Sequence, residues 1–119
     1  MLKNDWFMRQ INDTCRAIAL IIFNKKEPVY EIEDEQKEKG ADMIFNKLLF
    51  LLDENKFNEA ENLLFENLNP DDLNYLLVAI DFYNRISQID EKVLEENDFS
   101  REEIKMGLDD ITNIYNIKF

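Results

Sequence analysis

The stretch from Asn69 to Ser87, NPDDLNYLLVAIDFYNRIS, constrains the fold most, because ten of the fourteen residues from Leu73 to Ile86 are apolar or aromatic. At about 100° per residue these side chains cover most of a helix's circumference. They leave only a narrow polar stripe that runs through Asn74, Asp81 and Arg85. A helix that is apolar on nearly every side must be surrounded by other elements. We therefore expect a central buried helix over about residues 70–87.

The start of this helix carries a recognisable signal. Asn69 is a favoured N-cap residue, and Pro70 follows at the first helical position, where its missing N–H costs nothing. Asp71 and Asp72 would then lie in the positively polarised first turn. The sequence predicts that the central helix begins directly after Asn69.

The rest of the composition also favours helices. The chain has 119 residues, of which only two are Gly and two are Pro, whereas turn-rich β folds need many more. Its length suits one domain, and 45% hydrophobic residues suffice for a core. We expect a single all-α domain over residues 1–119.

The pattern of apolar and charged residues divides the domain into three parts. A basic amphipathic helix is predicted over residues 1–24, followed by a connector over 25–35, where charges surround Pro28, and a helical body over 36–117. We expect five helices, one further short helix and no strands. In the body, the second helix builds up from about Asp34, which places Gly40 inside it at a cost of about 1 kcal/mol relative to Ala. The last helix opens with Ser100 and Glu103 as a capping box.

The first helix has two apolar faces. One face carries Phe7, Ile11, Cys15, Ile18 and Ile22, and the opposite side carries Trp6 and Leu20. One face can pack on the domain, so the other needs a cover, either from the domain or from a second copy. We favour the second copy and predict a homodimer interface through this helix, with these candidate residues: Trp6, Arg9, Leu20 and Phe23.

Charge is distributed unevenly along the chain. Residues 1–26 hold five bases and two acids, a net of +3, whereas the rest holds nine bases and twenty-four acids, a net of −15. The total of −12 opposes binding to nucleic acid, whose phosphates attract Lys and Arg. The split suggests that the first segment lies against an acidic surface, its own or a partner's. A solvated pattern without a partner is the alternative.

Few residues offer reaction chemistry. The chain has no histidine, the usual general base and a common metal ligand, and its only glycines, Gly40 and Gly107, form no phosphate-binding loop. The single cysteine, Cys15, falls on the inner face of the first helix and is interpreted as core filler rather than a redox sensor. We expect a protein without catalytic activity, cofactor or metal ion.

The single cysteine and the length of the apolar runs also bear on the cellular location of the protein. One cysteine permits no intrachain disulfide, which is typical of a reducing, cytoplasmic setting. The longest apolar run, residues 17–23, is far shorter than the roughly 20 residues needed to cross a bilayer. We expect a cytoplasmic protein for which membrane contact is the less favoured alternative.

Two resemblances follow from longer stretches. The segment 44–68, IFNKLLFLLDENKFNEAENLLFENL, resembles one tetratricopeptide (TPR) helical hairpin, with Ala60 as the small residue where the two helices approach each other. It departs from the TPR pattern at two positions: Leu48 replaces the usual small residue of the first helix, and Asn55 replaces the usual turn glycine. Nearly the whole chain resembles a small bacterial family of unknown function, through DWFMRQI, KFNEAENLLFE and NDFSREEIKMGLDDI. The resemblance implies an all-helical, TPR-like fold and assigns no functional residue.

Three functions stay open at this point. The first is a non-enzymatic interaction or scaffold protein that is homodimeric through its first helix. The second is a peripheral membrane or regulatory protein that uses the basic, Trp6-bearing helix as a surface anchor. The third is a small-ligand binder or enzyme with an acidic pocket between helices.

Overall fold

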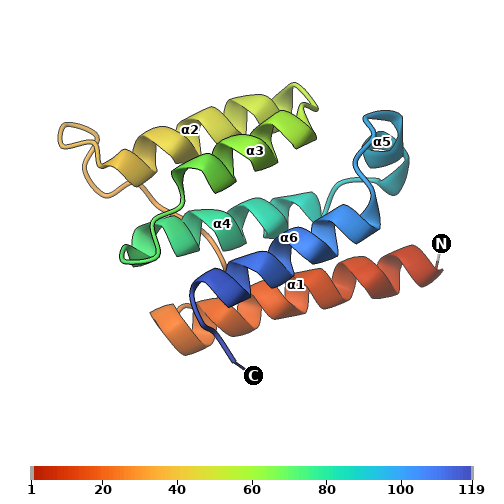
Figure 1. Ribbon diagram of the computed structural model, residues 1–119, viewed down its shortest axis with the longest axis horizontal. Helices are drawn as coiled ribbons and strands as arrows, with labels where there is room; N and C mark the ends of the chain where they lie inside the picture. Colours follow the sequence, from red (N-terminus) through yellow and green to blue (C-terminus); the bar gives the residue numbers. More distant parts are fainter. Residues whose placement is uncertain (1, 119) are drawn as a thin grey trace.

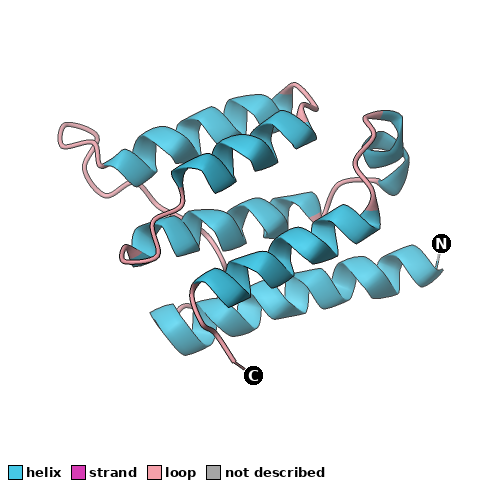
Figure 2. Cartoon of the chain, viewed as in Figure 1, coloured by secondary structure: helices cyan, strands magenta, loops and turns pink. Residues whose placement is uncertain are grey.

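The computed structural model describes the backbone of residues 2–118 and the side chains of residues 6–118. This part of the chain contains five longer helices, one short helix and no strand (Figure 2), as the sequence predicts. The helices are α1 (Leu2–Phe23), α2 (Gly40–Asp53), α3 (Phe57–Asn67), α4 (Leu73–Ile86), α5 (Glu91–Glu96) and α6 (Arg101–Ile114).

The α4 helix is central, which confirms the main prediction from the sequence. It packs against α1, α2 and α6. Figure 1 shows the α2–α3 pair above α4 and α1 below it. Seven of its side chains are at most 1% exposed: Leu76, Val78, Ala79, Ile80, Phe82, Tyr83 and Ile86. Buried apolar surface contributes about 25 cal/mol per Å², so the burial of these side chains stabilises the fold.

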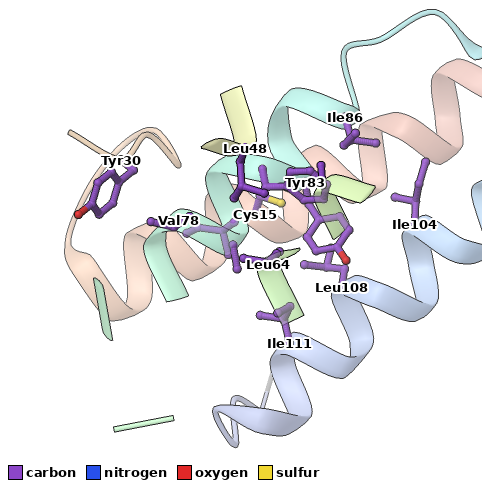
Figure 3. Packing of buried hydrophobic residues seen from close by; sticks show 14 of the residues in the cluster. Cys15, Tyr30, Leu48, Leu64, Val78, Tyr83, Ile86, Ile104, Leu108 and Ile111 are labelled. Atoms are coloured by element: carbon purple, nitrogen blue, oxygen red, sulfur yellow. The ribbon is translucent and has the colours of Figure 1, made fainter. Parts of the chain in front are cut away.

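The core joins all the long helices. Figure 3 shows Tyr83 of α4 at its centre, with Cys15 of α1, Leu64 of α3 and Leu108 of α6 nearby. All four side chains are buried. Cys15 is therefore a small apolar filler, as expected. The buried positions of Phe82 and Tyr83 also show that these two aromatic residues belong to the core rather than to an open groove.

The predicted cap of α4 is wrong by three residues. Asp72, not Asn69, is the N-cap, and its side chain accepts a hydrogen bond from Asn74 N at 2.9 Å. Asn69 instead forms a turn of its own: its Oδ1 accepts from Asp71 N, and its carbonyl accepts from Asp72 N. Asn followed by Pro also suits the first two positions of a β-turn. The local turn therefore competes successfully with helix initiation.

The second helix also starts later than predicted, at Gly40 rather than near Asp34. Residues 33–40 are all exposed, so no burial compensates the cost of ordering them as a helix. Gly40 is consequently the first helical residue, not an interior one. A Cβ at this position would lie 2.6 Å from the hydroxyl oxygen of Tyr75, so a close approach does explain the glycine.

The α2 and α3 helices form the predicted hairpin. Leu48, Phe57, Ala60 and Leu64 are buried along it. Asn55, which occupies the expected place of a turn glycine, has a positive φ of 58°, a conformation that asparagine tolerates better than most residues. The helical hairpin is therefore present, while its likeness to a TPR unit remains a resemblance.

The last helix follows its sequence signals closely. The Ser100 hydroxyl accepts from Glu103 N, and the Glu103 carboxylate accepts from Ser100 N, which completes the predicted capping box. Phe99 and Ile104 on either side of the cap are buried. The one short helix is α5, whose Glu91 pairs with Arg101 at 2.9 Å.

Candidate functional site

The outer face of α1 carries three large apolar side chains that are exposed to solvent. Trp6 is 59% exposed, Leu20 57% and Ile21 64%. Ile22 is also exposed, but it falls on the inner side of the helix, with Ile11 and Ile18. The inner face packs on α4 through Ile11, Cys15 and Ile18. Monomeric proteins leave single apolar residues in water without consequence, but several on one helix face indicate an interaction surface.

The middle of this face is polar. Arg9 and Asp13 are exposed, and Arg16 pairs with Glu27 of the connector at 3.5 Å. Both partners of this pair are about half exposed, so it adds at most about 1 kcal/mol to stability. Apolar side chains therefore lie at the two ends of the face, with charges between them.

A groove runs beside the C-terminal half of the same face. It has a volume of about 530 Å³ and lies between α1 and the first residues of the connector. Its lining consists of Asp13, Arg16, Ala17, Leu20, Lys26 and Glu27. Two acids and two bases therefore surround an apolar floor made of the other two side chains.

The four candidate interface residues differ in how far they are exposed to solvent. Trp6, Arg9 and Leu20 are exposed on the outer side of α1. Phe23 is only partly exposed and packs against the core, so it adds less to an interface. Ile21 and Ile22 were not among the candidates, although the apolar run 17–23 contains both. Ile22 was expected on the inner face.

A second group of polar residues holds the connector. Tyr30 donates its backbone N–H to Asp81 of α4 at 2.8 Å and its hydroxyl to Asp42 of α2. Asp81 is 2% exposed and also accepts from Arg85. Burial raises the pKa of the Asp81 carboxyl, although hydrogen bonds from Arg85 and Tyr30 oppose that shift. These contacts fix residues 24–39 across the domain, which is a structural role.

A third group lies between α3 and α6. The Tyr83 hydroxyl donates to Glu61 Oε2 at 2.6 Å, in space that a Cβ at Gly107 would occupy. Burial, together with the charges of Glu103 and Asp110, raises the pKa of Glu61 despite that hydrogen bond. An open groove of about 240 Å³ adjoins these carboxylates. Among the side chains described, no three acids or cysteines are arranged to hold a metal ion.

The thiol of Cys15 is not set up for reaction. Its side chain is fully buried, and burial, with a smaller contribution from the charge of Asp81, raises its pKa to about 12. Reaction as a nucleophile requires the thiolate, which is negligible near neutral pH at such a pKa. Cys15 therefore has a packing role in the core.

One further apolar groove lies on the far side of the domain. It has a volume of about 380 Å³ and is lined by Asn46, Lys47, Phe50, Leu51 and Leu63 of the α2–α3 hairpin. Phe50 is 62% exposed there, and Met43 is exposed on the same helix.

The comparisons with known proteins identify a family but no activity. The sequence model described as a family of unknown function (DUF6483) matches residues 1–116, and the chain belongs to this family. Neither the curated proteins nor the solved structures yielded a match. No helix in residues 2–118 is long and apolar enough to cross a membrane.

Proposed function

We propose that this chain, as a member of a family whose description assigns no activity, is a non-enzymatic interaction protein that forms a homodimer through α1. The observation that carries the proposal is the exposure of Trp6, Leu20 and Ile21 on one helix that is otherwise part of the core. Covering a large apolar side chain gains about 1.5–3 kcal/mol. A second copy offers the same surface, as a two-fold interface requires.

Charge supports a protein partner over nucleic acid. Residues 1–26 carry a net charge of +3, whereas the remainder of the chain carries a large excess of acids. The excess of acids over the whole chain disfavours the phosphates of nucleic acid as a partner. The scaffold role and a cytoplasmic location, supported by the single buried cysteine, are parts of the same proposal.

The test compares wild type with the double variant Trp6→Ala, Leu20→Glu by light scattering over a concentration series. Wild type is expected to dimerise and the variant to stay monomeric, because Leu20→Glu places a charge in the contact. Phe50→Ala is the matched control, since Phe50 has similar exposure but lies on α2. A wild type that stays monomeric at high micromolar concentration rejects the dimer.

The runner-up function is binding to a membrane surface through the same face. Trp6 and Ile21 are exposed, and Arg9 and Lys26 are exposed beside them, a combination that suits anionic headgroups. Removal of residues 1–26 is not a usable test, because Ile11, Cys15 and Ile18 are core residues. Flotation with anionic vesicles should use the double variant instead. Co-flotation of wild type but not the variant would favour the membrane.

A further inference from the structure

Trp6 and the groove beside Leu20 lie on the same side of α1. At about 100° per residue, Trp6, Asp13, Ala17 and Leu20 fall within about 60° around the helix axis. The groove is lined by the last three of these residues. Fourteen residues separate Trp6 from Leu20, which corresponds to about 21 Å along a helix. One face thus presents a protruding aromatic ring at one end and a hollow at the other.

We infer that two copies pair with their α1 helices antiparallel, so that Trp6 of each copy occupies the groove of the other. This inference rests on the proposed homodimer and adds its orientation and its anchor residue. Asp13 lies midway between Trp6 and Leu20 in the sequence. A two-fold axis that passes near Asp13 therefore brings Trp6 of one copy opposite Leu20 of the other, twice in the dimer.

The parallel arrangement does not bring these features together. It places each Trp6 beside its own equivalent and each groove beside the other groove, so both hollows stay unfilled. Filling a hollow with a large ring is what energetically dominant interface residues do. Antiparallel helices also have opposed macrodipoles, which contributes a smaller advantage.

The chemistry of the groove suits an indole ring. Ala17 and Leu20 supply apolar contact for the ring faces, and the carboxylate of Glu27 can accept the indole N–H. Arg16 and Lys26 supply cations that can lie over the ring. The four charges sum to zero, so the ring enters a surface without net charge.

The size of the contact sets its expected strength. A helix of 22 residues is about 33 Å long, and one helix face buries less area than a standard protein interface. We therefore expect a dimer with a dissociation constant on the order of micromolar, within reach of titration.

The first experiment uses Trp6 as its own probe, since it is the only tryptophan in the chain. Wild-type emission and acrylamide quenching are measured across the concentrations at which light scattering records dimer formation. A blue shift and reduced quenching that follow the dimer fraction support the inference. A dimer whose Trp6 stays as accessible as in the monomer overturns the inference and leaves self-association standing. A monomer at all concentrations overturns both.

The second experiment mixes two variants. Trp6→Ala removes the ring, and Ala17→Glu blocks the groove, so each alone should weaken dimerisation by about 100-fold, because the anchor is lost at both symmetric sites. Their mixture forms one intact ring–groove pair and should dimerise about tenfold more tightly than either variant. Circular dichroism checks that both variants fold. Absence of this recovery overturns the antiparallel arrangement, and Phe50→Ala provides the control.

Discussion

The substitution Gly107→Ala tests the packing of α6 against α4, because two physical effects predict opposite signs. Helix propensity alone favours Ala over Gly by about 1 kcal/mol in a helix interior. The added Cβ, however, would overlap the hydroxyl oxygen of Tyr83 and the Oε2 atom of Glu61, and would lie 2.8 Å from Tyr83 Cζ. Tyr83 is fully buried and has no room to move away.

The expected cost follows from these contacts. Overpacking a core site costs about 1–3 kcal/mol, and disrupting the Tyr83–Glu61 hydrogen bond to a charged acceptor costs about 1.5–3 kcal/mol. After subtraction of the propensity gain, we expect Gly107→Ala to lower the free energy of unfolding by about 1.5–5 kcal/mol. Urea denaturation measures this change directly.

Two further variants make this test specific. Gly40→Ala should cost less, because its added Cβ meets only the end of the partly exposed Tyr75 side chain. In a Tyr83→Phe background the hydroxyl is gone, so Gly107→Ala should destabilise the protein less than in wild type, which is a coupling between the two sites. A Gly107→Ala protein as stable as wild type, or more stable, would refute the packing argument.

Three other predictions follow from the buried groups. The folded state raises the pKa of Glu61 above its usual 4.5. The stability that this group contributes is therefore full below pH 4.5 and is lost as pH rises through the folded pKa. Glu61→Gln should gain stability relative to wild type as pH rises above about 4.5, and equal pH profiles of the two proteins in urea titrations would contradict this. Tyr30→Phe should cost about 1.5–3 kcal/mol, because it removes the hydroxyl that donates to the buried Asp42 carboxylate. Hydrogen exchange should then accelerate in residues 24–39, and unchanged protection would count against the connector's attachment. Cys15 should resist a thiol-specific reagent at pH 8 until urea unfolds the protein; rapid labelling of the folded chain would show that the site opens.

Periodicity and composition predicted the parts of the fold that depend on burial. The apolar circumference of residues 73–86 indicated the central helix, and the burial of Tyr83 and Ile86 confirms it. The box of Ser100 and Glu103 was readable because capping depends on residues three apart in the sequence. Such local and periodic signals need no knowledge of the neighbouring elements.

The errors arise where a contact distant in sequence decides the outcome. The start of α4 was misplaced because Asn69 caps a turn instead, and the Tyr115 hydroxyl donates to its carbonyl at 2.7 Å from the other end of the chain. Asp81 was expected in a polar stripe, yet Tyr30 of the connector covers it. Likewise, whether Ile22 is buried depends on where the elements that pack on α1 end. Nothing within about four residues of Asp81 or Ile22 specifies their surroundings, whereas at Asn69 the following Pro70 is itself a local signal for a turn.

The candidate interface was predictable in kind but not in detail. The sequence indicated that α1 has apolar residues on two sides, and Trp6 and Leu20 are indeed exposed. The groove beside Leu20 involves Lys26 and Glu27 of the connector, so it depends on how the chain turns after α1. That turn contains Asn24 with a positive φ of 53°, which the helical pattern alone does not indicate.

The most direct test of the central claim is the mass of the wild-type protein in solution. Sedimentation equilibrium should give a weight-average mass that rises with concentration from 14.3 kDa toward twice that value, with the rise absent in Leu20→Glu. A mass that stays at 14.3 kDa throughout, or a rise that Leu20→Glu leaves unchanged, would contradict the assignment of α1 as the surface of self-association.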